Sequence, residues 1–200
     1  NLVAELPSIL DQLKNHQVVI EVGSTKSPIF ESIKNHPKRK LFVSTHPMAG
    51  TEFSGPDAAI ENLFKNKRAV ICDKESSEPE AVKLVEDMYQ NGLGMNLIYM
   101  DSIAHDVHTA YISHISHICS FALANTVLEK EKESDAIFEL ASGGFESTVR
   151  LAKSNAAMWV PIFMQNKENV LDVLNEHISQ LKKFKACLEK ENFEYLSDLI

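Results

Sequence analysis

The sequence has no run of apolar residues near the roughly 20 that a helix needs to cross a bilayer. It does not open with a basic stretch followed by an apolar one, which is the pattern of a secretory signal. Cysteine is scarce: Cys72, Cys119 and Cys187 are far apart and odd in number, which argues against a disulfide framework or a cysteine zinc site. Basic residues are also few, 20 against 28 acidic ones, and the net charge of -8 disfavours a nucleic-acid partner. These absences predict a cytoplasmic protein with neither a membrane nor a nucleic-acid partner.

Glycine is limited to seven residues, and no G-x-G-x-x-G motif occurs among them. This motif lets a backbone turn approach a dinucleotide pyrophosphate between a strand and a helix. Gly92 and Gly94 come nearest, but Leu97 stands in the third glycine position, and the pair follows a predicted helix and precedes a predicted strand. The apolar fraction of 44% still predicts a folded domain.

The first half of the chain alternates between the two kinds of apolar pattern. Helical spacing predicts helices, and short β-branched runs predict strands. The predicted helices cover 2–14, 28–35, 56–64 and 76–90, and the predicted strands cover 17–22, 40–45, 68–73 and 95–100. Such alternation is typical of βαβ units and of a parallel sheet. Since the chain starts with a helix and lacks the glycine motif, we expect an incomplete α/β domain without its first strand–helix–strand portion.

The second half contains no convincing strand. Helical periodicity covers 101–130, then 131–141, where Gly143 and Gly144 should end the helix, and then 147–190. We therefore place a domain boundary at residue 100, between an α/β part and an all-helical part. The helical part is too long and too apolar to stand alone, so it either packs on the α/β part or, as we favour, forms a dimer.

Two segments at strand ends could carry chemistry. Gly23, Ser24 and Lys26 follow a predicted strand, where open parallel sheets place their ligands, although a plain capping turn would look the same. His46 follows the next strand, and Pro47 restricts it to extended geometry. An imidazole there suits a general base at neutral pH, with a surface loop histidine as the other interpretation.

The helical half adds several more candidates. His105, His108, His114 and His117 share one predicted helix. His105 and His114 would lie about 180° apart on it, so we expect no shared metal. His114 and His117 are interpreted as a pair of neutral donors on a buried helix, or singly as buried core residues.

A further group follows the glycine pair, where Arg150 could bind a carboxylate through its planar fork or simply lie on the surface. Trp159, the single tryptophan, is expected in the core or at an interface.

Taken in order, these pieces resemble the prephenate/arogenate dehydrogenase family over nearly the whole chain. The matching segments are Val22-Gly23-Ser24-Thr25-Lys26, His46-Pro47-Met48-Ala49-Gly50 with Ser54-Gly55, Ser113-His114-x-x-His117, and Ala141-Ser142-Gly143-Gly144-Phe145 leading to Arg150. The resemblance implies a partial Rossmann-type parallel sheet at 1–100, the C-terminal portion of a nucleotide-binding domain. It also implies an all-helical substrate-binding and dimerisation domain at 101–200, and hence a homodimer.

The resemblance further implies oxidative decarboxylation of prephenate to 4-hydroxyphenylpyruvate with NAD or NADP, a step of tyrosine biosynthesis. His46 would take the proton of the ring hydroxyl, and Ser24 would hold His46 and this hydroxyl in position relative to each other. The remaining implied contacts are His117 and Arg150 on the substrate, His114 and Gly143 shaping its pocket, and Gly23, Ser24 and Lys26 on the cofactor. Without the glycine motif, we expect these 200 residues alone to bind NAD poorly and to be inactive or nearly so.

Three other hypotheses stay open. The substrate could be arogenate, which carries an amino group where prephenate has a keto group. A β-hydroxyacid-type reductase shares the two-part plan, but it would usually have a lysine on the helix that here carries His and Ser. The third hypothesis is a non-catalytic helical dimerisation or regulatory module, which should not bind a prephenate analogue.

Overall fold

The computed structural model describes residues 2–14, 16–51, 53, 55–132 and 137–200. A four-stranded sheet in the order β1-β2-β3-β4 forms its first half. The strands are β1 (Val19–Glu21), β2 (Phe42–Met48), β3 (Arg68–Cys72) and β4 (Asn96–Met100). β1 pairs with β2, and β3 with β4, in parallel, but β2 and β3 are antiparallel. The prediction of a wholly parallel sheet is therefore wrong for the central pair.

The reason lies in the connection between β2 and β3. A parallel pair needs a crossover, usually a helix, and we predicted one at 56–64. Instead, only a short 3-10 turn forms there, η2 (Pro56–Ala58), and Asn62 takes a positive φ of 59°, which no helix continues through. Without a crossover helix, the chain returns alongside β2 in the opposite direction.

Helices cover both faces of the sheet because neighbouring residues of a strand point to opposite sides. Phe42 packs with α1 (Leu2–Gln12) and α2 (Ser27–Ile33) on one face. Val43 packs with α3 (Pro79–Asp87) on the other. The π-helical turn η4 (Met88–Gly92) follows α3 directly.

The described residues of the second half form helices and the short turns between them, with no strand. Its elements are α4 (Ser102–Thr109), η5 (Ala110–His114), α5 (Ile115–Glu131), η6 (Phe138–Leu140), α6 (Gly143–Val149), η7 (Arg150–Lys153), α7 (Ala156–Gln165), α8 (Lys167–Glu189) and α9 (Phe193–Leu199). The predicted helix at 101–130 is confirmed as the continuous run of α4, η5 and α5. The predicted helix at 131–141 is wrong where the structure describes it, since only η6 forms, while 133–136 lie outside the described residues.

The glycine pair also acts differently from the prediction. Gly143 and Gly144 begin α6 rather than end a helix, because the preceding Ser142 is extended (φ -126°, ψ 178°) and takes the N-cap position. Arg150 consequently lies just after α6, where it begins the short 3-10 helix η7.

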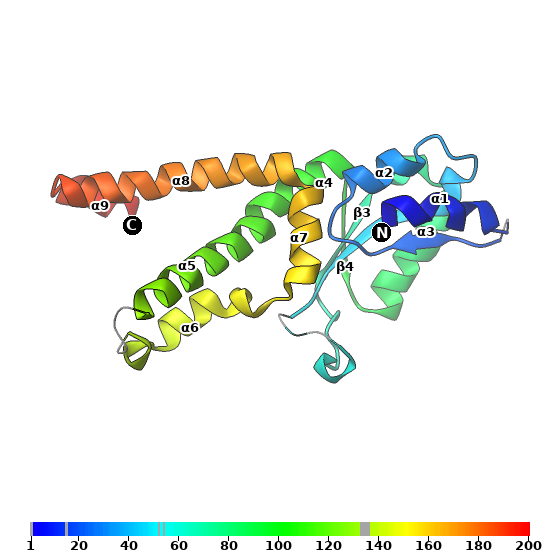
Figure 1. Ribbon diagram of the computed structural model, residues 1–200. Helices are drawn as coiled ribbons and strands as arrows, with labels where there is room; N and C mark the ends of the chain where they lie inside the picture. Colours follow the sequence, from blue (N-terminus) through cyan, green and yellow to red (C-terminus); the bar gives the residue numbers. More distant parts are fainter. Residues whose placement is uncertain (1, 15, 52, 54, 133–136) are drawn as a thin grey trace.

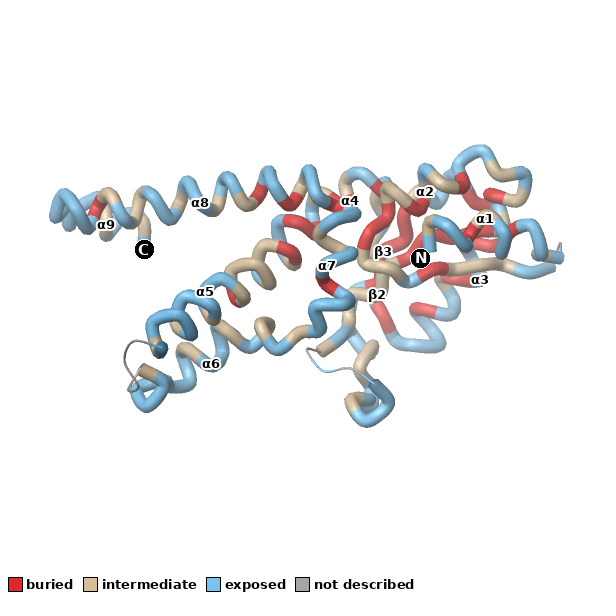
Figure 2. The backbone as a smooth tube through the Cα atoms, in the orientation of Figure 1, coloured by how far each residue is buried: buried red, intermediate tan, exposed pale blue. Residues whose placement is uncertain are grey.

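The two halves of the chain differ in how many of their residues are buried. α5 and α8 extend away from the sheet as two diverging arms, and α7 lies between them near the sheet (Figure 1). Buried residues concentrate in the α/β half and where the helices meet it, whereas the arms are largely exposed (Figure 2). None of the helices in the described part of the chain is both long and apolar enough to span a membrane.

Candidate active site

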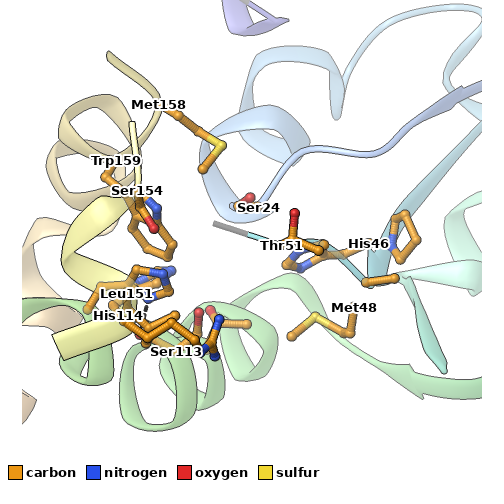
Figure 3. Close-up of a pocket in the computed structure, with 16 residues that line it drawn as sticks. Ser24, His46, Met48, Thr51, Ser113, His114, Leu151, Ser154, Met158 and Trp159 are labelled. Atoms are coloured by element: carbon orange, nitrogen blue, oxygen red, sulfur yellow. Dashed lines mark hydrogen bonds between the residues drawn. The ribbon is translucent and has the colours of Figure 1, made fainter. Parts of the chain in front are cut away.

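A cavity of about 330 Å³ lies where the sheet meets the helical half. Its walls come from the β1–α2 loop, the end of β2 and the loop after it, α4, η5, α5, η7 and α7 (Figure 3). The lining residues are Ser24, His46, Pro47, Met48, Ala49, Gly50, Thr51, Thr109, Ser113, His114, His117, Arg150, Leu151, Ser154, Met158 and Trp159. Five of the predicted site residues therefore line one cavity: Ser24, His46, His114, His117 and Arg150. The first and the last of them are more than a hundred positions apart in the sequence.

His46 lies within β2 and not after it, since the strand continues through Pro47 to Met48. Its Nδ1 is 2.9 Å from Nε2 of His105. The pKa of His46 is lowered to about 3, chiefly by burial and also by the nearby His105, Lys26 and His114, while Asp106 opposes this shift. His46 is therefore neutral at physiological pH and able to accept a hydrogen bond or a proton.

Lys26 does not face this cavity. It is fully buried, and its ammonium group contacts the Glu21 carboxylate and donates to the carbonyl oxygen of Thr45 at 2.6 Å. Burial lowers the pKa of Lys26, although Glu21 beside it opposes that shift. The expected contact between Lys26 and a cofactor is thus replaced by a structural role beneath the site.

The Glu21 carboxylate also holds the turn that carries Ser24. It accepts hydrogen bonds from the Gly23 backbone N–H at 2.7 Å and from the Ser44 hydroxyl at 2.9 Å. A Cβ at Gly23 would come within 3.1 Å of Glu21 Oε2 and 3.2 Å of Leu2 Cδ1, so a larger residue here would press on the carboxylate that holds the turn. The buried charges of Glu21 and Lys26 therefore fix the loop at the mouth of the cavity.

A second cavity of about 400 Å³ adjoins the first, and the two share Ser24 and Met158. Its remaining lining residues are Leu2, Gly23, Thr25, Ile29, Pro161, Ile162 and Gln165. The second cavity lies beyond the carboxyl end of β1, the place where open α/β sheets bind ligands. Gly23 lines this second cavity rather than the first, and Gly143 lines neither.

His117 and Trp159 form the helical wall of the first cavity. Their rings stack with centroids 3.6 Å apart and planes 29° apart. His117 Nδ1 lies 3.0 Å from the Ser113 carbonyl oxygen, which can only accept, so Nδ1 carries the hydrogen and Nε2 remains an acceptor. Burial lowers the pKa of His117, and Arg150 lowers it further. The sequence predicted Trp159 for the core or an interface; it is buried and also lines the cavity.

His114 is buried deeper in the same wall. Its ring meets Trp159 edge-on, with centroids 5.9 Å apart, and its Nδ1 lies 3.3 Å from the Asn166 amide nitrogen. Burial lowers the pKa of His114 to about 4. His114 is therefore a neutral residue that shapes the cavity.

Three residues behind the cavity were not among the predicted site residues. His105 was considered only for metal binding, and Asp106 and Asn166 were not considered at all, yet all three are buried and hydrogen-bonded to one another or to cavity residues. The signal for His105 and Asp106 in the sequence was a histidine next to an aspartate on a predicted helix. Within the part of the chain that the structure describes, no three His, Cys, Asp or Glu side chains are grouped to hold a metal ion. Ser54, part of the family-like segment after His46, lies outside the described residues.

Comparison with known proteins agrees with this arrangement. Residues 3–98 match the family described as "Prephenate dehydrogenase, nucleotide-binding domain", and residues 101–200 match "Prephenate dehydrogenase, dimerization domain". Prephenate dehydrogenase of Bacillus subtilis is 31% identical over 92% of this chain and 50% of its own length. Cyclohexadienyl dehydrogenase of Zymomonas mobilis is 28% identical over 92% of this chain and 63% of its own length.

Solved structures show the same fold. Prephenate dehydrogenase of A. aeolicus, in complex with hydroxyphenyl propionate and NAD+, superimposes with a TM-score of 0.86 at 30% identity, over 98% of this chain and 69% of that one. Arogenate dehydrogenase of Synechocystis gives a TM-score of 0.79 at 27% identity, over 98% of this chain and 70% of that one. The present chain spans only about half the length of the Bacillus subtilis relative. With both halves matched and the site residues brought together, the chain belongs to the prephenate/arogenate dehydrogenase family.

Proposed function

We propose that this chain forms the substrate site and the catalytic base of an NAD(P)-dependent prephenate dehydrogenase. One observation carries the proposal: a single cavity joins the neutral imidazole of His46 to the guanidinium of Arg150 and the hydroxyl of Ser24. A cyclic substrate with a hydroxyl at one end and a carboxylate at the other needs a base near the hydroxyl and a cation near the carboxylate. Because the protein has a net charge of -8, the carboxylate needs a cation placed locally, and Arg150 supplies it.

The residues suggest how the reaction proceeds. As hydride leaves the ring carbon, the hydroxyl on that carbon becomes strongly acidic, so even a weak base such as His46 can take its proton. Loss of the ring carboxylate as CO₂ then returns an electron pair to the ring, and His46 gives the proton back to the phenol oxygen. Arg150 binds a substrate carboxylate, and Ser24 keeps the hydroxyl next to His46. Because formation of the aromatic ring drives the reaction, the protein mainly positions the reacting groups.

The second cavity fits one end of the cofactor. It adjoins the substrate cavity at Ser24, and Gly23 leaves room there for a close approach of the backbone. A bound nicotinamide supplies the hydride acceptor. We therefore propose that Gly23 and Ser24 contact the nicotinamide end, with NAD and NADP to be compared directly, and that Lys26 contributes by holding this loop.

We also propose a domain boundary at residue 100 and a homodimer formed by the helical half. The boundary falls between β4 and α4, where the family matches change as well. α8 and the short α9 after it expose apolar side chains, among them Leu181 (55% exposed), Leu188 (67%) and Phe193 (76%). Helices with such faces need a partner surface, and a second copy of the chain supplies it.

Binding of 4-hydroxyphenylpyruvate, followed by calorimetry on this chain, tests the proposal. Arg150→Gln should weaken binding by about 10- to 150-fold, which corresponds to the 1.5–3 kcal/mol of a hydrogen bond to a charged group. Lys153→Gln is the matched control, since Lys153 is an exposed cation of the same η7 that does not line the cavity. His46→Asn should leave binding within a few-fold but abolish turnover of prephenate in the native polypeptide that carries this chain.

Three results would contradict the proposal. A chain that does not bind the product would instead support a non-catalytic module. Equal losses from Arg150→Gln and Lys153→Gln would mean that the effect is only one of net charge. A clear preference for arogenate over prephenate in turnover would move the assignment to arogenate dehydrogenase.

A further inference from the structure

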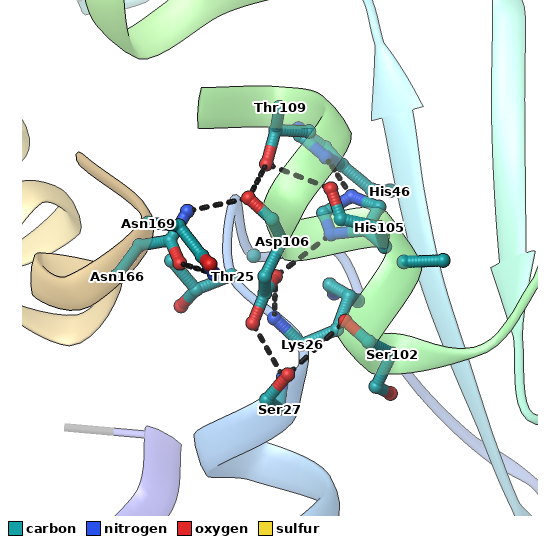
Figure 4. A network of polar contacts seen from close by, with 12 residues as sticks. Thr25, Lys26, Ser27, His46, Ser102, His105, Asp106, Thr109, Asn166 and Asn169 are labelled. Atoms are coloured by element: carbon teal, nitrogen blue, oxygen red, sulfur yellow. Dashed lines mark hydrogen bonds and ion pairs between the residues drawn. The ribbon is translucent and has the colours of Figure 1, made fainter. Parts of the chain in front are cut away.

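A buried chain of hydrogen bonds runs from His46 away from the cavity. His46 Nδ1 is 2.9 Å from His105 Nε2, and His105 Nδ1 is 2.8 Å from the Asp106 carboxylate (Figure 4). His105 and Asp106 are 1% and 2% exposed, so water does not compete for these bonds. Both belong to α4, in the other half of the chain from His46.

The Asp106 carboxylate is held as an ion. It accepts hydrogen bonds from the backbone N–H groups of Lys26 and Ser27, each at 2.8 Å. Burial alone would raise the pKa of Asp106, but the hydrogen bonds from His105, Ser27 and Lys26 together lower it below its usual value. An ionised carboxylate only accepts hydrogen bonds, so His105 Nδ1 must carry a hydrogen and donate it.

This direction of donation determines which ring nitrogen of His46 carries the hydrogen. In the neutral form of His105, hydrogen on Nδ1 leaves an acceptor at Nε2, so His105 Nε2 accepts and His46 Nδ1 donates. A neutral His46 with hydrogen on Nδ1 has its lone pair on Nε2, the nitrogen left for a ligand in the cavity that His46 lines. The charged and titratable groups facing His46 are His105, Lys26, His114 and Asp106, and Asp106 is the only anion among these four.

We propose that His105 and Asp106 are positioning residues that hold His46 as its Nδ1–H tautomer, with Nε2 as the atom that takes the substrate proton. The proposal rests on the function proposed above for His46. Once Nε2 is protonated, the bond from His46 Nδ1 to His105 becomes charge-assisted and stronger, which stabilises the imidazolium at the moment it forms. The pair thereby acts on the base without touching the substrate, as a carboxylate does behind the histidine of other catalytic sites.

The tautomer can be measured directly in this chain, without substrate or cofactor. A long-range proton–nitrogen NMR spectrum of the ¹⁵N-histidine-labelled protein at pH 7 distinguishes ring nitrogens that carry hydrogen from those that do not. We expect His46 Nδ1 to carry the hydrogen and Nε2 to lack it, with the His46 signal assigned by its loss in His46→Gln. A wild-type spectrum with the hydrogen on Nε2 would overturn the proposal, whatever the activity.

Substitutions separate positioning from packing. His105→Phe keeps a ring but removes the acceptor, whereas His105→Gln keeps an oxygen that can accept from His46 Nδ1. In the native polypeptide that carries this chain, His105→Phe should lower kcat by about 10- to 100-fold, with KM within about threefold. It should also shift His46 toward the Nε2–H tautomer. His105→Gln should restore most of the kcat and most of the Nδ1–H tautomer of His46. His108→Phe, on the exposed side of the same helix, should change neither the kcat nor the tautomer.

Each outcome is informative. If His105→Phe and His105→Gln lower kcat equally, or if neither lowers it, the positioning role of His105 is overturned. If His105→Phe does not fold, the wild-type spectrum alone decides. If the spectrum shows the expected tautomer but prephenate is not turned over, the function proposed for the chain fails while the hydrogen-bond chain stands.

Discussion

The buried ion pair between Glu21 and Lys26 allows a quantitative prediction about stability. Their side chains are 2% and 0% exposed, so neither charge is solvated by water. Lys26→Met keeps the length of the side chain but leaves the Glu21 carboxylate buried without its cation. Removal of one partner from such a pair typically costs about 3–5 kcal/mol, because an uncompensated charge remains. Glu21 keeps its hydrogen bonds from Ser44 and Gly23, so we expect a loss near the lower end, about 3 kcal/mol.

Urea unfolding followed by circular dichroism at pH 7 measures this loss. Lys34→Met is the matched control, since Lys34 pairs with Glu31 at 2.5 Å but the two side chains are 45% and 60% exposed. An exposed pair contributes about 0–1 kcal/mol, so the control should stay close to the parent protein. The double variant Glu21→Gln/Lys26→Met removes both charges and should regain at least half of the stability lost by Lys26→Met alone.

Two results would refute this reasoning. If Lys26→Met loses less than about 1 kcal/mol, the pair is not the desolvated one that the structure shows. If the double variant is no more stable than Lys26→Met, the loss comes from packing of the lysine stem and not from an unpaired charge. Lys26 is also one cause of the lowered pKa of His46, so Lys26→Met should raise that pKa above about 3, with burial still holding it below 6.5, as an NMR titration would show.

Two further predictions concern the stability of the chain at low pH and its oligomeric state. Because the pKa of His46 lies at about 3 and that of His114 at about 4, the unfolded chain takes up protons below pH 6.5 that the folded chain does not. The free energy of unfolding should therefore fall between pH 6 and 4.5 by up to about 1.4 kcal/mol per pH unit for each histidine. His46→Gln should remove one such contribution, whereas an unchanged slope, or an equal effect from the exposed His16→Gln, would contradict the assignment. Light scattering at micromolar concentration should give twice the mass of one chain, and a monomer at every concentration would refute the proposed dimer.

The sequence was informative wherever the signal was local. Periodicity along the chain predicted all four strands and the long helix beginning near residue 101, because burial of one face imposes a spacing that can be read directly. The motif order in the chain also predicted Ser24, His46, His114, His117 and Arg150 as site residues, and all five line one cavity. These five residues were predicted from the family resemblance that the motifs carry, and not from the pattern of helices and strands.

The wrong or missing predictions share a cause. The direction of β3 depends on whether the segment before it forms a crossover, and the position of Lys26 depends on Glu21 and Thr45 from two different strands. His105 meets His46 across 59 positions of sequence, and Asp106 meets Lys26 across 80. Hydrogen-bond direction, burial of charge and strand pairing are set by neighbours that come together only when the chain folds. For this reason a motif in the sequence was enough to mark His46 as the candidate base, while the residues proposed to orient it became visible only in three dimensions.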